Sequence, residues 1–172
     1  SYPGIHIDNI SAAREATNYL LELGHDKIAF IYGEHKTLLT MDRERGYREA
    51  MREAGKIIDN GWVVEGGLTL DGAIDATDKL LAQPNPPTAI FCANDEMAMG
   101  CLHAVKDAGL DVPGDISVIG FDDNRYARVM DPPLTTIAQP AEKIGQRVME
   151  RLLKEIENGR SKNAEPEIVP HE

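Results

Sequence analysis

Carboxylate and amide side chains recur in this chain directly after hydrophobic segments. Such side chains stand at residues 8–9 (Asp-Asn), 33–34 (Gly-Glu), 94–95 (Asn-Asp) and 122–124 (Asp-Asp-Asn). Their oxygen and N–H groups accept and donate hydrogen bonds, so they can recognise the hydroxyl groups of a small polar solute. The same residue types also form turns and cap helices, and each position therefore has a structural alternative.

The position of each polar residue relative to the following segment favours one of these roles. Asp122 is predicted to contact a ligand, because no helix obviously follows it. For Asp95 we favour an N-cap, since it directly precedes a predicted helix. For Asp8 and Asn9 we favour a structural turn, and for Asn94 the turn and ligand roles stay equally open.

Catalytic and metal-binding motifs are missing from the sequence. It contains no G-x-S-x-G nucleophile motif, no phosphate-binding G-x-x-x-x-G-K loop and no G-x-G-x-x-G turn. Cys92 and Cys101 have no neighbours at zinc-binding spacing and are expected to be small buried residues of a reducing cytoplasm. Asp122 and Asp123 are adjacent in an extended segment and should point to opposite sides. We therefore expect no enzyme, no metal and no cofactor.

Composition limits the partners of the chain. The formal net charge of −11 repels nucleic-acid phosphates, so we expect no direct binding to DNA. No apolar run approaches the roughly 20 residues of a membrane-spanning helix. The first residues carry neither a basic region nor an apolar region, so we expect no signal peptide and no membrane.

Strands and helices are predicted to alternate along the chain. Strands are expected at 5–7, 27–32, 62–64, 88–92, 116–120, 135–137 and 167–169, and helices at 11–23, 42–54, 71–83, 96–108 and from Pro140 to Gly159. This alternation predicts an α/β protein, a three-layer α/β/α sandwich with a parallel sheet. Ligands of such sheets bind beyond the carboxyl ends of the strands, where the polar residues above gather.

Five segments in order resemble the LacI/GalR family of transcriptional repressors. They are GHDKIAFI at 24–31, RERGY at 43–47, PTAIFCANDEMAMG at 87–100, VPGDISVIGFD at 112–122 and PPLTTIAQP at 132–140. The resemblance implies a periplasmic-binding-protein-like fold of two lobes, of which residues 1–172 form part of the effector-binding region. Residues 9–134 would form the C-terminal lobe, residues 135–159 would belong to the N-terminal lobe, and 160–172 would be a return strand.

The implied fold predicts an uncovered surface on the last helix. A DNA-binding headpiece and most of the N-terminal lobe would lie outside this sequence, and the helix after Pro140 would lack its usual partner. Its apolar stripe includes Ile144, Val148, Leu152 and Ile156. We expect this stripe to pack on a neighbouring chain or on the cleft face of its own lobe, because a bare patch of this size is unfavourable.

The family's effector contacts correspond to five positions of this chain. Arg43 and Asp122 match an arginine and an aspartate that hold the effector, and Asn94 matches a less general contact. Phe121 is expected to form either an apolar wall or part of the core. Leu68 stands where many relatives have an aromatic residue that stacks on the effector, so stacking is in doubt here.

The resemblance implies the effector-sensing part of a repressor. The effector would be a nucleoside or a sugar, because segments 6–9 and 131–140 look most like a nucleoside-responsive member. Operator DNA would be bound only through the absent headpiece, and a homodimer would form through helix 71–83 and loop 125–131. The alternative is a periplasmic sugar-binding protein of a transport system, which shares the fold.

Overall fold

A computed structural model describes residues 4–34, 37–159 and 165–171. The chain divides into two compact units, which are described separately. Unit 2 comprises Asn9–Ile137, and unit 1 comprises Ser1–Asp8 together with Ala138–Glu172.

Unit 2 contains a five-stranded sheet between pairs of helices. Its strands are β2 (Ile28–Tyr32), β3 (Val63–Glu65), β4 (Ala89–Cys92), β5 (Ser117–Asp122) and β6 (Thr135–Ala138), in the order β3-β2-β4-β5-β6. The pairs β2–β3, β2–β4 and β4–β5 are parallel. Every residue of β2 and β4 is buried, as expected for central strands covered on both faces.

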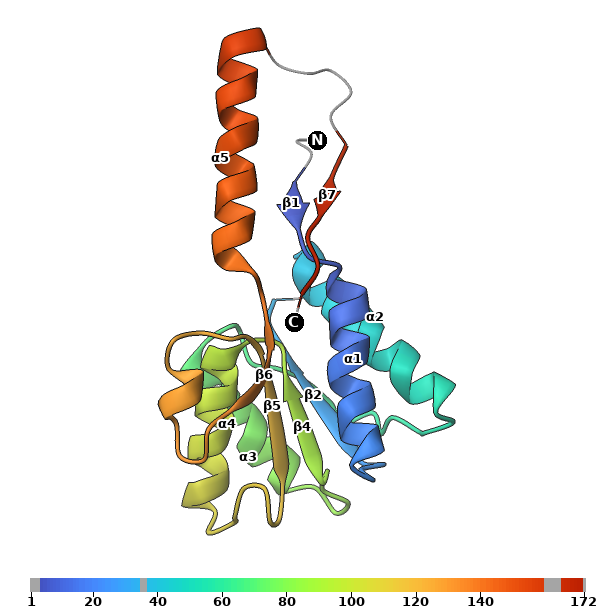
Figure 1. Ribbon diagram of the computed structural model, residues 1–172. Coiled ribbons are helices and arrows are strands. Elements are labelled where there is room, and N and C mark those ends of the chain that lie inside the picture. The colour runs from blue at the N-terminus through green and yellow to red at the C-terminus, as the bar shows by residue number, and fades with distance from the viewer. Residues whose placement is uncertain (1–3, 35–36, 160–164, 172) are drawn as a thin grey trace. The chain divides into compact units, whose positions relative to one another are not determined.

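Two helix pairs cover the two faces of this sheet (Figure 1). One pair consists of α1 (Asn9–Glu22) and α2 (Leu38–Glu53), and the other of α3 (Leu70–Leu81) and α4 (Asp95–Asp107). A short 3-10 helix, η1 (Ala127–Val129), follows β5. The three-layer α/β/α sandwich predicted from the sequence is therefore confirmed.

Threonine and asparagine caps determine where the helices of unit 2 begin. Thr37, Thr69 and Asn94 are the N-caps of α2, α3 and α4, and each side chain accepts the backbone N–H of the third residue of its helix. Because Thr37 is a cap, α2 begins four residues before the predicted start at residue 42. Helix α1 likewise begins at Asn9 rather than at residue 11.

Unit 1 combines a short sheet with one long helix. Strands β1 (Ile5–His6) and β7 (Glu167–Ile168) are parallel, and α5 spans Ala141–Asn158. Arg147 of α5 donates from Nε to Glu167 of β7 at 2.6 Å. Of the predicted return segment 160–172, residues 160–164 and 172 lie outside the described residues.

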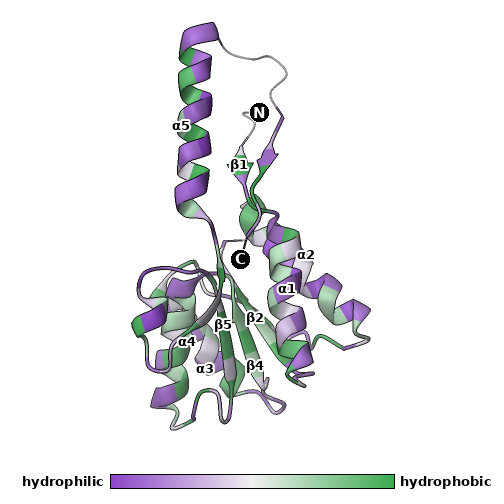
Figure 2. Ribbon diagram, in the orientation of Figure 1, coloured by the Kyte–Doolittle hydropathy of each residue, from purple (hydrophilic) through white to green (hydrophobic). Residues whose placement is uncertain are grey.

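The apolar stripe of α5 is uncovered in the single chain. No residue of this helix is buried, and Ile156 is 70% exposed. Hydrophobic residues alternate with polar ones along α5 (Figure 2). Both covers expected for the stripe, the cleft face of its own lobe and a neighbouring chain, stay predictions. No helix among the described residues has the length and apolarity needed to cross a membrane.

A close crossing of α1 and α2 depends on Gly46. A Cβ atom at this position would lie 2.3 Å from the carbonyl oxygen of Ile10 and 2.9 Å from the Cβ of Ala13. Only a glycine therefore allows the two helix backbones to approach this closely. The crossing places Asn9, at the start of α1, next to Arg43 of α2.

We predict that Gly46→Ala lowers the free energy of unfolding by about 1–3 kcal/mol, because the new methyl group overpacks the α1–α2 contact. Urea unfolding followed by circular dichroism measures this loss. Gly145→Ala in α5 is the matched control, since a Cβ atom there meets nothing within 4 Å. Gly145→Ala should leave the free energy of unfolding unchanged or raise it. Equal destabilisation by both variants would contradict the packing role of Gly46.

Candidate ligand-binding site

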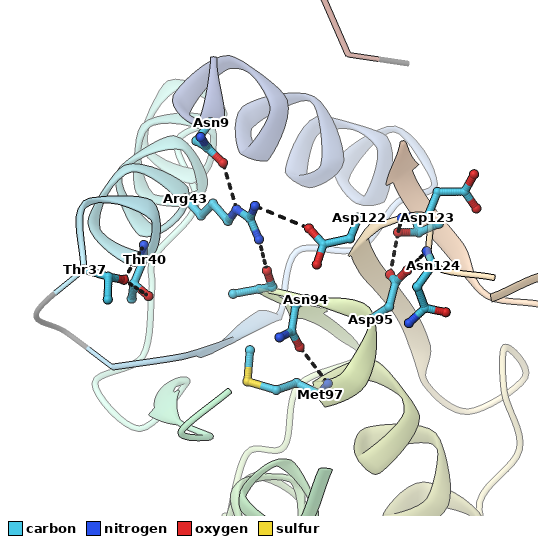
Figure 3. Close-up of polar contacts among 12 residues, drawn as sticks. Asn9, Thr37, Thr40, Arg43, Asn94, Asp95, Met97, Asp122, Asp123 and Asn124 are labelled. Atoms are coloured by element: carbon cyan, nitrogen blue, oxygen red, sulfur yellow. Dashed lines mark hydrogen bonds and ion pairs between the residues drawn. The ribbon is translucent and has the colours of Figure 1, made fainter. Parts of the chain in front are cut away.

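Arg43 lies at the centre of a polar cluster at the carboxyl edge of the unit 2 sheet (Figure 3). Its guanidinium donates from Nε to Asn9 Oδ1 at 3.0 Å and from Nη1 to the carbonyl oxygen of Ala93. Nη2 forms an ion pair with Asp122 Oδ1 at 3.4 Å. The planar fork of an arginine thus joins α1, the end of β4 and the end of β5.

Phe121 supports the guanidinium from the apolar side. The Cζ atom of Arg43 lies 3.6 Å from the centroid of the Phe121 ring, which is cation–π geometry. Phe121 is fully buried and stacks with Phe91 at a centroid distance of 6.5 Å. Of the two roles expected for Phe121, the structure therefore places it in the core, beneath Arg43.

The two charges of the pair differ in their access to solvent. The Arg43 side chain is 8% exposed, whereas the Asp122 side chain is 38% exposed. Burial lowers the pKa of Arg43, and the neighbouring Asp122 carboxylate opposes that shift. Arginine nevertheless stays charged in proteins, so a positive charge lies beside the Asp122 carboxylate. Asp122 is then the group that can present oxygen atoms to a ligand.

Backbone geometry reinforces the special position of Asp122. It ends β5 with a φ angle of 119°, and Asp123 follows with a φ angle of 51°. Residues other than glycine rarely adopt positive φ, and each such residue costs of order 1–3 kcal/mol. Asp123 is exposed, and its side chain points away from Arg43 (Figure 3). The two aspartates thus lie on different sides, as predicted for adjacent residues.

The cap of α4 is Asn94 and not Asp95, for which the sequence favoured this role. Asn94 is the N-cap of α4, and its Oδ1 accepts the backbone N–H of Met97 at 2.8 Å. The predicted cap at Asp95 is wrong. Its carboxylate instead accepts the backbone N–H of Asn124 at 2.7 Å and the hydroxyl of Thr136 at 2.6 Å.

Leu68 lies in the loop between β3 and α3, at the same carboxyl edge of the sheet. It has a φ angle of 62° and packs over Gly33, where a Cβ atom would lie only 2.4 Å from Leu68 Cδ2. Its side chain is partly exposed and offers a ligand an aliphatic surface. It has no aromatic ring, so it cannot stack on a ligand as an aromatic residue would.

Two partners of Arg43 were missed by sequence reasoning. Asn9 was assigned to a structural turn, but its side chain is buried and accepts from Arg43. Its position after the first strand was the signal, because that is where the other polar residues of the site also stand. The carbonyl group of Ala93 carries no side-chain signal and could be found only from the fold.

Comparisons with known proteins agree with this architecture. Residues 17–172 match the family model of the periplasmic binding protein-like domain. The HTH-type transcriptional repressor CytR of Escherichia coli (strain K12) is 44% identical over 155 residues, which is 90% of this chain and 46% of the relative. PurR of Vibrio vulnificus is 41% identical over 143 residues, which is 83% of this chain and 43% of that repressor.

Solved structures give the same result. A putative LacI transcriptional regulator from Bacillus cereus subsp. cytotoxis superposes with a TM-score of 0.95 at 31% identity, covering 99% of this chain and 60% of its own. The transcriptional regulator CelR in complex with cellobiose has a TM-score of 0.87 at 34% identity. The match covers 97% of this chain and 50% of the CelR chain.

The chain belongs to the periplasmic binding protein-like domain family. The relatives and structural neighbours named above are LacI-family regulators, as the resemblance predicted. The chain spans about half the length of the curated relatives that it matches.

We predict that Arg43→Lys destabilises the protein by about 1–3 kcal/mol, because a lysine cannot reproduce the fork and leaves buried acceptors without donors. Urea unfolding measures this change. Arg48→Lys is the control, because Arg48 lies on the same helix but its own side chain is 48% exposed. That variant should change stability by less than about 0.5 kcal/mol. Similar losses in both variants would show that the Arg43 contacts are not special.

Proposed function

We propose that this chain is the effector-sensing part of a LacI-type transcriptional repressor and that its unit 2 binds a small polar molecule, a nucleoside or a sugar. The observation that carries the proposal is the Arg43–Asp122 ion pair at the carboxyl ends of parallel strands. Ligands of open α/β sheets bind at this edge. Residues 9–134 would then form the C-terminal lobe, residues 135–159 would belong to the N-terminal lobe, and the segment after them would be the return strand.

The chemistry of the site suits hydroxyl groups. The Asp122 carboxylate is partly exposed, so its oxygens can accept hydrogen bonds from neighbouring hydroxyls of a ribose or hexose ring. Arg43 fixes the carboxylate in place, and a fixed acceptor loses little side-chain entropy when a ligand binds. Leu68 would contribute an apolar contact to a base or to the carbon face of a sugar.

Between the two ligand classes we favour a nucleoside. Segments 6–9 and 131–140 resemble those of a nucleoside-responsive repressor, and CytR is 44% identical to this chain. The sugar alternative is supported by CelR, whose structure holds cellobiose. A transport protein that binds sugars in the periplasm is less favoured, because the relatives named above are transcriptional regulators.

The repressor role implies further properties of the intact protein. It would act in the cytoplasm without catalysis, and operator DNA would be bound by a headpiece outside this sequence, which fits the charge of −11 here. The effector would change DNA binding only to the extent that its affinities for the two conformations differ.

We predict that Asp122→Asn in the intact protein weakens binding of cytidine at least tenfold, since a neutral amide accepts more weakly than a carboxylate and donates where an acceptor is needed. Isothermal titration calorimetry with cytidine, adenosine, ribose and cellobiose measures the change and identifies the ligand class.

Asp123→Asn is the matched control for this titration. It removes the same charge from the next residue, whose side chain points away from Arg43, and asparagine also tolerates a positive φ. This control should bind cytidine like the unmodified protein. If no nucleoside or sugar binds to the intact protein, or if both variants bind equally well, the proposed function is wrong.

We further propose a homodimer through helix 71–83 and loop 125–131. The loop exposes Tyr126 and Val129, the latter at 71%, as a surface for a second copy.

Val129→Asp should raise the dimer dissociation constant about tenfold or more, because a charge at the interface core is costly. Sedimentation velocity measures this. Ile57→Asp, at an exposed position outside both segments, should leave the dimer unchanged, and a monomeric unmodified protein would contradict the proposal.

A further inference from the structure

Asp95 is a buried carboxylate that caps no helix. It is the first residue of α4 and only 1% exposed, while the capping role belongs to Asn94. Oδ2 of Asp95 accepts the backbone N–H of Asn124 at 2.7 Å, and Oδ1 accepts the Thr136 hydroxyl at 2.6 Å (Figure 3). A single carboxylate thus joins the segment after β5 to strand β6.

The hydrogen-bond chain continues from Thr136 to the strained turn. The backbone N–H of Asp123 donates to Thr136 Oγ1 at 3.3 Å, and the Thr136 hydroxyl then donates to Asp95. The backbone N–H groups of both residues that follow Asp122 are therefore held by Asp95, one directly and one through Thr136. The positive φ angles of Asp122 and Asp123 need such support, because a strained turn persists only where its surroundings over-determine it.

The neighbouring strand is shaped to admit this carboxylate. A Cβ atom on Gly120 of β5 would lie 2.4 Å from Asp95 Oδ1, so any side chain at this position would displace the Asp95 carboxylate. Burial raises the pKa of Asp95, and the hydrogen bonds from Thr136 and Asn124 oppose that shift. Burying a carboxylate is costly, so an apolar residue would serve simple packing better. A carboxylate is useful at this position because it accepts the hydrogen bonds that position the backbone of the turn.

We propose that Asp95 is a positioning residue that holds the Asp122 turn and strand β6 together, so that a ligand contact at Asp122 reaches β6. Strand β6 ends at Ala138, where the chain passes from unit 2 into unit 1. A ligand that pulls on Asp122 moves a turn whose backbone is tied to Thr136 of β6. The ligand contact rests on the proposed function, whereas the tie between turn and strand does not.

Hydrogen exchange of the intact protein without ligand tests the tie. Asp95→Asn should raise exchange about tenfold in the amides of residues 123–124 and in β6, since an uncharged amide holds its donors less firmly. Exchange in β2 and β4 should stay unchanged. Glu96→Gln is the matched control, because it removes the same charge from the exposed neighbour in the same turn of α4. Unchanged exchange in Asp95→Asn, or equal changes in both variants, would overturn the proposal.

Substitutions of Thr136 separate positioning from general loss of stability. Thr136→Val keeps the shape but removes the hydroxyl, and it should reproduce the faster exchange at Asp123 and in β6. Thr136→Ser keeps the hydroxyl and should restore slow exchange. If serine and valine behave alike, the hydroxyl relay does not operate and the proposal is wrong.

Hydrogen exchange in the presence of cytidine then distinguishes this proposal from the proposed function. In the unmodified protein, saturating cytidine should slow exchange in both the 122–124 turn and β6. In Thr136→Val, it should protect the turn but not β6. Equal protection of β6 in both proteins contradicts transmission through Asp95. If cytidine does not bind to the unmodified protein, the nucleoside proposal fails, while the ligand-free comparison still decides whether Asp95 ties the turn to the strand.

Discussion

The ion pair between the buried Arg43 and the partly exposed Asp122 is the interaction on which the rest of the site depends. A guanidinium taken out of water requires acceptors on several sides, and here α1, β4 and β5 each provide one. The pair therefore couples three elements that are distant in sequence. It also leaves one partner, Asp122, partly exposed and fixed in orientation, which is the property that a ligand-binding carboxylate needs.

Close backbone approaches make this arrangement possible. Gly46 lets α1 and α2 cross so that Asn9 reaches Arg43, and Gly120 makes room for the Asp95 carboxylate beside β5. Arg43 and Asp95 are thus buried at places where a glycine leaves room for close packing. The same few residues therefore determine both the close packing and the hydrogen bonding of the site. A buried charge is tolerated only when it is hydrogen-bonded.

Four of the carboxylate and amide groups at or just after the ends of β4 and β5 have different roles. Asn94 caps a helix, Asp95 supports the turn, Asp122 pairs with Arg43, and Asn124 continues the turn. In the proposed function, Asp122 is the group among them that touches the ligand. The others hold the backbone that presents it.

The sequence alone determined the order of strands and helices, since the continuous apolar runs of β2 and β4 and the helical periodicities depend on local pattern. It also indicated Asp122, which no helix follows. Tertiary structure alone decided that Asn9 and the Ala93 carbonyl bind Arg43, that Phe121 lies in the core, and that Asn94 rather than Asp95 is the cap. The physical reason is that the side-chain partners of Arg43 lie 34 to 79 residues away and are chosen by packing geometry, which residue types do not encode locally. The cap bond from Met97 to Asn94 is local, but the contact that engages Asp95 instead comes from Thr136, 41 residues away.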